Sequence, residues 1–216
     1  FVFTDKGCGS DTATKTTIIN PLPTPQFIFS APNCLNQSIT FTDQSVGNAG
    51  TVTNRHWDMG NGTQHDFTNG NPFTETYAAT GTYLVKLSVT SSKGCKSDTL
   101  VKQVMIRPIP VVGFILPVVC VNDAFAQFTD TSKINSCSIT TWSWNFGDPA
   151  SGALNTSTLK NPQHRYNAIG HYTVTLIVTS NNNCVATLVQ SFTVNGDIPF
   201  SNFPPLNPAA LFPTYS

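Results

Sequence analysis

Charge is what this sequence most lacks: Asp, Glu, Lys and Arg make up 10% of its 216 residues, and the formal net charge is zero. Proteins that bind nucleic acids or anionic membranes carry a concentrated basic surface, so neither partner is expected. A nucleophile elbow, a His-Glu-x-x-His motif, a phosphate-binding glycine loop and paired carboxylates at repeated positions are also missing. The sequence therefore predicts a protein that is not an enzyme.

Long apolar stretches are missing too. The longest, residues 111–121, contains Gly113 and Pro117 and is far shorter than the roughly 20 residues that cross a bilayer, so no membrane insertion is expected. The chain starts at Phe1 with neither an initiator methionine nor a charged-then-apolar leader. This start predicts a piece of a longer protein.

The segments that are present alternate apolar and polar residues, as β-strands do. Examples are "SITFTDQS" at 38–45, "TYLVKLSVT" at 82–90, "AQFTDTS" at 126–132 and "HYTVTLIVT" at 171–179. Clusters rich in Gly, Asn and Pro, such as residues 60–72 and 181–183, are typical of turns. Short strands with frequent turns predict an all-β sandwich or barrel.

The sequence also repeats itself with a period of about 87 residues, the size of one small sandwich. "PQFIFSAPNCLNQSITFTDQS" at 25–45 matches "VGFILPVVCVNDAFAQFTDTS" at 112–132, and "GTYLVKLSVTSSKGC" at 81–95 matches "GHYTVTLIVTSNNNC" at 170–184. "DKGCGSDTATKTTIINPLP" at 5–23 matches "SKGCKSDTLVKQVMIRPIP" at 92–110. The chain is therefore predicted to hold two full repeats and the end of an earlier one.

Three motifs resemble the signature of PKD domains, immunoglobulin-like sandwich repeats: "WDMGNG" at 57–62, "WNFGDP" at 144–149 and "NPQHRYNAIGHYTVTLIV" at 161–178. The first repeat departs from the family pattern at Met59 and Asn61 and has no His before Tyr77, and the second has Pro149 where Gly is usual. The cysteine-bearing form is similar to repeats in large secreted surface proteins of gliding, type IX-secreting bacteria. The resemblance implies an adhesive or motility role by analogy.

The expected fold is thus a tandem of immunoglobulin-like β-sandwiches preceded by a partial one. Residues 1–23 would be the C-terminal strands of a preceding repeat, 24–107 the first PKD domain, 111–195 the second, and 196–216 a proline-rich tail that is a linker or docks by Phe200, Phe203 and Phe212. The resemblance assigns structural roles to Trp57, Gly60, Tyr77, Tyr83, Trp144, Gly147, Asp148, Tyr166 and Tyr172.

The "WNFGDP" motif has two interpretations. Trp142, Trp144 and Phe146 share one face of a strand, after which Gly147 permits a sharp exit and Asp148 accepts backbone N–H groups in the turn. Alternatively, oxygen ligands at this corner bind calcium, the candidates being Asp58, Asn61, Asn145 and Asp148. The structural interpretation is favoured because only two side-chain ligands are visible in each repeat, and no other cofactor is expected.

Trp142 and the four histidines raise further alternatives. Trp142 could stack on sugar rings, but its face places it over the end of the core. His56, Asp58, His65 and Asp66 are interpreted as solvated surface, since the second repeat has no matching zinc ligands. His164 falls in the family's Pro-x-His-x-Tyr motif and is expected to hydrogen-bond a loop, whereas His171 has no assigned role.

Four of the six cysteines recur at matching positions, Cys34 with Cys120 and Cys95 with Cys184, which is typical of disulfides formed in an oxidising compartment. We predict Cys34–Cys95 and Cys120–Cys184, each closing a loop of about 60 residues and contributing roughly 4 kcal/mol on the chain-entropy model.

The remaining cysteines are Cys8, which aligns with Cys95, and Cys137, which has no counterpart in the first repeat. We expect both to be unpaired or bonded outside the chain, although the even count leaves Cys8–Cys137 open. Residues 1–20 would be completed by upstream chain or by strand addition from a neighbouring molecule, because their apolar residues lack cover: Val2, Ile18 and Ile19.

Together these features predict an extracellular or bacterial cell-surface, structural or adhesive stalk segment of a larger multi-PKD protein. Its partners would be neighbouring repeats, further copies in a fibre, or surface glycans. Alternatives are a carbohydrate- or calcium-binding module of a secreted hydrolase and a filament subunit joined by strand exchange. Thr12 and Thr99, each in an Asp-Thr pair after the Gly-Cys turn, resemble an O-glycosylation signal of the same bacteria.

Overall fold

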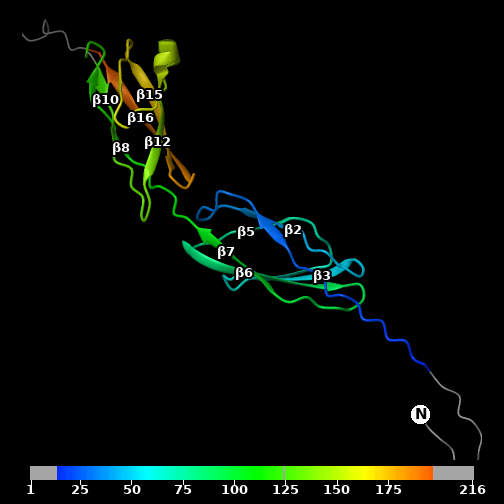
Figure 1. The fold of residues 1–216 in the computed structure, drawn as a ribbon. Coiled ribbons are helices and arrows are strands. Elements are labelled where there is room, and N and C mark those ends of the chain that lie inside the picture. Colours follow the sequence, from blue (N-terminus) through cyan, green and yellow to red (C-terminus); the bar gives the residue numbers. More distant parts are fainter. Residues whose placement is uncertain (1–13, 124, 197–216) are drawn as a thin grey trace, which may run out of the picture. The chain divides into compact units, whose positions relative to one another are not determined.

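The structure is a computed structural model that describes residues 14–123 and 125–196, and the chain divides into two compact units, Phe1–Ile106 and Arg107–Ser216. Strands dominate both units (Figure 1). Within the described residues, no helix has the length and apolar character needed to cross a membrane.

Unit 1 is a sandwich of two antiparallel sheets, ordered β1-β2-β5 and β4-β3-β6-β7. Its strands in chain order are β1 (Phe27–Phe29), β2 (Ile39–Asp43), β3 (Val52–Asp58), β4 (Gln64–Phe67), β5 (Phe73–Glu75), β6 (Gly81–Ser91) and β7 (Leu100–Ile106). The long β6 and β7 run side by side (Figure 1).

The core of unit 1 lies between these sheets, because alternate residues of each strand point inward. Phe27 and Phe41 come from one sheet, Trp57 and Leu87 from the other, and all four are buried. Phe27 meets Trp57 edge-on at 5.0 Å between ring centroids. The buried aromatic residues thus pin the two sheets together.

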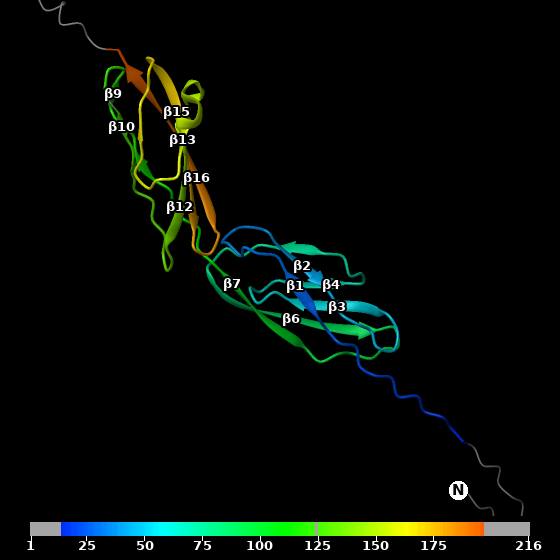
Figure 2. The same ribbon diagram turned by 45° about the horizontal axis from the view of Figure 1, so that its top comes forward.

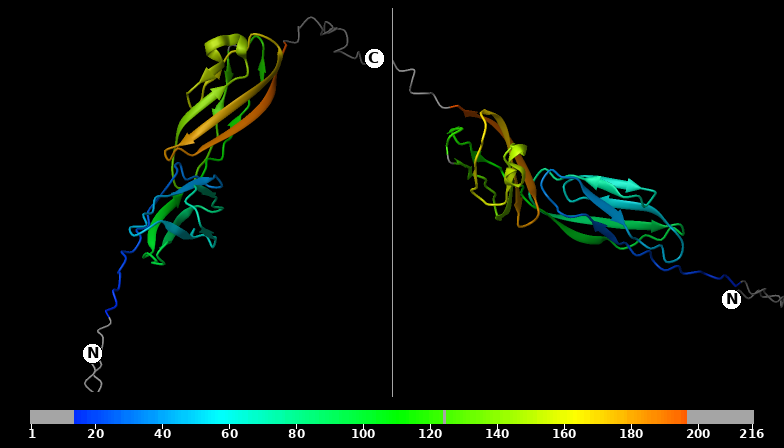
Figure 3. Two further views of the ribbon diagram at one scale, coloured as in Figure 1. Left: turned by 90° about the vertical axis from the view of Figure 1, so that its right-hand side faces the viewer. Right: turned by 90° about the horizontal axis from the view of Figure 1, so that it is seen from above.

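Unit 2 repeats this plan with a larger second sheet, ordered β13-β12-β15-β16-β9, facing two short pairs, β8–β11 and β10–β14. The bounds are β8 (Phe114–Ile115), β9 (Val119–Cys120), β10 (Ala126–Gln127), β11 (Thr129–Asp130), β12 (Ile139–Asn145), β13 (Thr156–Ser157), β14 (Gln163–His164), β15 (Gly170–Ser180) and β16 (Val185–Asn195). The ribbon of β15 and β16 runs the length of the unit (Figures 2 and 3).

A 3-10 helix, η1 (Pro149–Asn155), separates β12 from β13 in unit 2. In unit 1 the corresponding β3 and β4 are joined by a short turn closed by the Met59 N–H donating to the Thr63 carbonyl at 3.0 Å. The extra residues of "DPASGALN" therefore form a surface loop and leave the sheet unchanged.

The turn prediction for residues 60–72 is wrong in part, because β4 occupies four of them. β4 pairs with β3 in the register Arg55↔Phe67 to Asp58↔Gln64. His65 and Phe67 lie toward the sandwich and are half-buried, while Gln64 and Asp66 are exposed. Pairing along β3 outweighs the low strand propensity of this polar segment.

Candidate functional sites

The turn that follows β3 and β12 is held by side-chain oxygens. In unit 1 Asp58 Oδ1 accepts the Gly60 N–H at 2.9 Å, and in unit 2 Asn145 Oδ1 accepts the Gly147 N–H at 2.9 Å. Both glycines have positive φ, 74° and 71°, a region that glycine enters without strain. The motif is therefore a strand end and its corner, as the structural interpretation predicts.

Asp148, however, does something other than predicted. Its carboxylate accepts from His164 Nε2 at 3.1 Å, and both side chains are buried. The ring of His164 stacks on Phe146, with centroids 4.4 Å apart and planes 12° apart. The turn N–H that Asp148 was expected to accept goes to Asn145 instead, so that part of the prediction is wrong.

The carboxylate and the donor of this side-chain pair occupy opposite positions in the two units. Unit 1 has Asn61 where unit 2 has Asp148, and Glu75 where unit 2 has His164. Asn61 Nδ2 donates to Glu75 Oε1 at 2.9 Å. Each unit thus places one carboxylate and one donor at the same corner, on opposite sides, which indicates a structural cross-link.

The four calcium candidates already have partners. Asp58 Oδ2 lies 3.0 Å from Lys86 Nζ, and Asn61 Oδ1 accepts the Thr63 N–H at 2.9 Å. The bond from the Gly60 N–H, aided by Lys86, lowers the pKa of Asp58. Among the described residues, no group of three or more His, Cys, Asp or Glu side chains is placed to hold a metal ion.

The histidines assigned to the surface of unit 1 form pairs with carboxylates. His56 Nδ1 lies 2.7 Å from Asp66 Oδ1 on the exposed face, and His65 Nε2 lies 2.9 Å from Glu75 Oε2. His171 Nδ1 of unit 2 lies 2.9 Å from the Thr193 hydroxyl. His65 also stacks on Phe67, with ring centroids 5.7 Å apart, and is half-buried, so its prediction as solvated surface is wrong.

The motif aromatics anchor the same corner from inside. Tyr166 donates its hydroxyl to the Phe146 carbonyl at 2.9 Å, and Tyr77 donates to the equivalent Met59 carbonyl at 3.1 Å. Tyr172 and Tyr83 pack against these rings at 4.2 and 4.4 Å. Both units therefore satisfy the backbone at the strand end with a buried tyrosine.

Burial raises the pKa of Tyr166 well above its ordinary value, and the Asp148 carboxylate adds to the shift. Folded Tyr166 keeps its proton at a pH where the unfolded chain, with a tyrosine pKa of about 10, has lost it. The free energy of unfolding of unit 2 should therefore be level below about pH 10 and fall above it by about 1.4 kcal/mol per pH unit. Denaturant unfolding at several alkaline pH values measures this slope.

Tyr166→Phe should reduce that slope in unit 2, where burial also raises the pKa of Tyr172 and leaves a smaller fall, and should not change it in unit 1, where burial raises the pKa of Tyr77. An absorbance titration in which folded Tyr166 ionises near pH 10, a roughly ordinary value, would contradict the expectation.

Both predicted disulfide pairings are wrong. Cys95 and Cys120 are free thiols, as is Cys137, whereas Cys34 and Cys184 are disulfide-bonded. The predictions Cys34–Cys95 and Cys120–Cys184 each require one of the free residues. Cys137 is unpaired, as expected, and its Sγ contacts the Asn135 carbonyl oxygen at 3.6 Å. Cys8 lies outside the described residues.

The long strands explain the error. Asn36, two residues after Cys34, donates to the Tyr77 carbonyl just before β6 begins, whereas Cys95 follows the end of β6. Cys120 pairs with Asn195 at the end of β16, and Cys184 precedes its start. Each strand has 11 residues, about 33 Å at roughly 3 Å per residue, while bonded cysteines need Cα atoms within about 7 Å.

Thiol mapping of the oxidised chain is therefore expected to find Cys95, Cys120 and Cys137 open to alkylation before reduction. Cys34 and Cys184 should be alkylated only after reduction, because their sulfurs are already bonded. Peptide mass analysis with and without reductant distinguishes the two groups. A peptide linking Cys34 to Cys95, or Cys120 to Cys184, would overturn the assignment.

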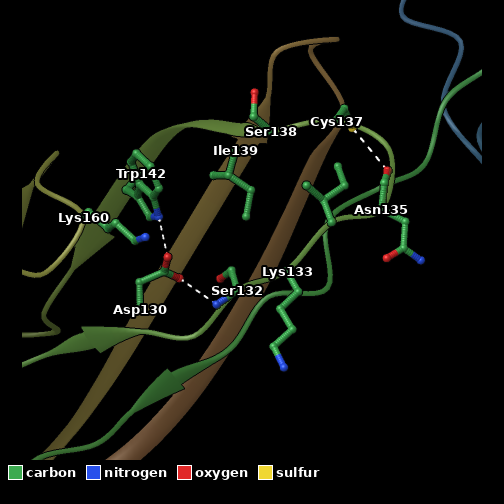
Figure 4. A pocket seen from close by; sticks show the side chains of 10 residues that line it. Asp130, Ser132, Lys133, Asn135, Cys137, Ser138, Ile139, Trp142 and Lys160 are labelled. Atoms are coloured by element: carbon green, nitrogen blue, oxygen red, sulfur yellow. Dashed lines mark hydrogen bonds between the residues drawn. The ribbon is translucent and has the colours of Figure 1, made fainter.

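Trp142 lines a pocket of about 470 Å³ on unit 2, formed by β11, β12 and the loop between them (Figure 4). The ring is half-buried and packs against the core, as predicted from its face. Its Nε1 donates to Asp130 Oδ2 at 2.9 Å, and Asp130 Oδ1 accepts the Ser132 N–H at 3.0 Å. Lys160 Nζ lies 5.7 Å from the ring centroid.

Unit 1 closes the same position. Arg55 stands where unit 2 has Trp142, and its Nε donates to Asp43 Oδ2 at 2.6 Å. Gly70 aligns with Lys160 through the Asn-Pro that follows each, and a Cβ there would meet Arg55 at 3.3 Å. Arg55 thus pairs with the Asp43 carboxylate of unit 1, whereas the equivalent carboxylate of unit 2, Asp130, lies beside an open pocket. The sequence aligned Trp142 with Arg55, but it did not show that each contacts the equivalent aspartate of its own unit.

Several predicted residues lie outside these sites. Thr99 is exposed in the segment before β7, and Ile18 and Ile19 are 78% and 90% exposed in a segment without regular structure. Thr12, Val2 and the tail residues Phe200, Phe203 and Phe212 fall outside the described residues. Glycosylation and strand addition remain predictions.

The corner, the sandwich and the tyrosines together define an immunoglobulin-like β-sandwich module. The family model for the PKD domain matches residues 20–106 and 108–195, so the chain belongs to the PKD domain family and carries two copies. PKD domains are in general non-catalytic modules and typically extracellular.

Three solved structures are similar to the chain. The PKD1 domain of Vibrio anguillarum Epp is 22% identical over 41% of this chain and 96% of that one, with a TM-score of 0.37. The PKD1 domain of the Vibrio cholerae metalloprotease PrtV is 30% identical over 40% and 98%, with a TM-score of 0.35. Fibronectin(III)-like modules of Clostridium thermocellum CbhA are 16% identical over 79% and 95%, with a TM-score of 0.44.

Proposed function

We propose that this chain is a structural spacer or adhesive stalk segment of a long secreted surface protein, of the kind made by gliding, type IX-secreting bacteria. The observation that supports this most is the use made of the polar motif residues. In both units the polar side chains of the corner are engaged in hydrogen bonds within the fold. One accepts a turn N–H group, one carboxylate is cross-linked to a side-chain donor, and a tyrosine hydroxyl donates to a backbone carbonyl. Side chains so engaged stabilise a fold and are not free to bind a substrate.

The segment between the units supports the spacer role. Residues 107–111 read "RPIPV", and proline fixes φ near −65° and removes a backbone donor. Proline-rich linkers are semi-rigid, whereas glycine-rich linkers behave as flexible coils. A spacer needs the first behaviour in order to transmit force from one repeat to the next.

The test compares the chain with a Pro108→Gly, Pro110→Gly variant carrying the same pair of distance labels, one in each unit. With all disulfides reduced, single-molecule energy transfer should give a narrow distance distribution for the natural chain and a broad one for the variant, because glycine restores backbone freedom. Equally broad distributions for both chains would remove the main support for a spacer. Thermal melting of each variant checks that the sandwiches are intact.

A further inference from the structure

The open pocket beside Trp142 has the composition of a ligand site, and unit 1 provides a closed version of it. Its charged lining residues are Asp130, Lys133 and Lys160. Two cations against one anion leave a net charge of +1. Within the described part of the chain, neither lysine has an ion-pair partner, so neither charge is neutralised. Lys160 Nζ lies over the Trp142 ring, 5.7 Å from its centroid, and has to move aside when a ligand stacks there.

Apolar and polar surfaces alternate around the pocket. Trp142 and Ile139 are half-buried apolar side chains, and Asp130 lies between Trp142 and Ser132, bonded to both (Figure 4). Asn135 and Ser138 are exposed at its edge. Small-molecule sites usually combine a mostly apolar lining with a few well-placed polar groups, whereas most residues that line this pocket are polar, which suits a ligand rich in polar groups.

From this arrangement we infer that the Trp142 pocket binds an acidic sugar unit of a polysaccharide. The apolar face of a pyranose ring fits the indole and Ile139, while its carboxylate is attracted to Lys133 and Lys160. The hydroxyls donate to the remaining lone pairs of Asp130 and bond with Ser138 and Asn135. This site is independent of the spacer role, which rests on the linker and the corners.

An acidic peptide fits the same pocket less well. The carboxylates of the peptide would meet the two lysines, but they would also face the Asp130 carboxylate. Acidic side chains carry no hydroxyl group that could donate a hydrogen bond to Asp130. Like charges brought together at a partly dry surface are unfavourable. A ligand that combines one carboxylate with several hydroxyls satisfies both signs of charge, which favours the sugar.

The test titrates the full chain with tetragalacturonate at low salt and follows the three indole N–H signals by NMR. Saturable shifts are expected at Trp142, and Trp57 and Trp144 serve as buried internal references. Added salt should weaken binding, because exposed charges are screened. Maltotetraose, which is neutral, and a tetraglutamate peptide are the two control ligands.

Trp142→Arg, made together with Lys160→Gly, is the matched variant, since unit 1 accommodates Arg55 against the equivalent aspartate with Gly70 beside it. It should keep the unit 2 amide spectrum and lower the affinity at least about tenfold. Lys133→Ala and Lys160→Ala should each weaken binding several-fold and reduce its salt dependence.

Three results would overturn the proposal: no saturable shift with tetragalacturonate, equal binding of maltotetraose or tetraglutamate, or unchanged affinity in a folded Trp142→Arg, Lys160→Gly variant. None of these results bears on the linker measurement, so the two proposals fail separately.

Discussion

Replacing Trp144 with alanine is expected to lower the free energy of unfolding of unit 2 by about 3–5 kcal/mol. The side chain is 1% exposed and meets Phe114 edge-on at 5.1 Å and Phe128 at 5.7 Å. Its Nε1 donates to the Leu159 carbonyl at 2.9 Å, so the substitution leaves a cavity and an unpaired acceptor. Small domains have only about 5–15 kcal/mol in total.

Native-state hydrogen exchange measures the effect strand by strand. Amides of β12 and β15 should exchange faster, while those of β3 and β6, which surround the separate core of unit 1, should be unchanged. Trp142→Ala is the matched control, because that ring is half-buried and its loss should cost clearly less. Equal losses for the two tryptophans would show that the core does not depend on Trp144.

The alternation of residues around the two tryptophans was enough to predict which side chains face the core. Trp142, Trp144 and Phe146 share a face by period 2, and the structure buries Trp144 and Phe146 and half-buries Trp142. Such predictions succeed because they depend on neighbours along one strand. The repeat then carries the same assignment to Trp57 without further information.

Contacts between distant segments were predicted less well. The partner of Asp148 is His164, 16 residues away on another strand, and in unit 1 the carboxylate moves to Glu75. The recurrence of four cysteines indicated disulfides but not which end of an 11-residue strand each sulfur occupies. Periodicity assigns a residue to a face, whereas pairing also requires its position along the sandwich.

The Trp142 pocket shows the same limit of sequence-based prediction at a candidate functional site. Asp130 of this pocket and Asp43 of unit 1 occupy matching places in "FTDTS" and "FTDQS", yet nothing local relates either aspartate to the residue 12 positions later. Only the packing of the two sheets in each unit brings Arg55 to Asp43 and Trp142 to Asp130. A repeat with a conserved acid and a variable partner is therefore a pattern to search for in such tandem chains.

Gly147→Ala is expected to destabilise unit 2 by about 2–4 kcal/mol, from two causes that add. A Cβ at Gly147 would lie 2.3 Å from the Thr173 carbonyl oxygen and 2.9 Å from its nitrogen. Those atoms belong to β15, where Thr173 is paired with Ser191 of β16, so the clash is with hydrogen-bonded backbone and not with a flexible side chain. Overpacking of this kind costs about 1–3 kcal/mol, and the φ of +71° adds about 1 kcal/mol for a residue with a Cβ.

Gly152→Ala separates the two causes. Gly152 has a φ of +58° but nothing within 4 Å of its Cβ position, so only the backbone term applies, about 1 kcal/mol. Gly60→Ala should fall between them in its own unit, since its Cβ would lie 2.9 Å from the Leu84 carbonyl oxygen. Denaturant midpoints give the order directly. If Gly147→Ala and Gly152→Ala cost the same, close approach of β15 is not what requires glycine in this motif.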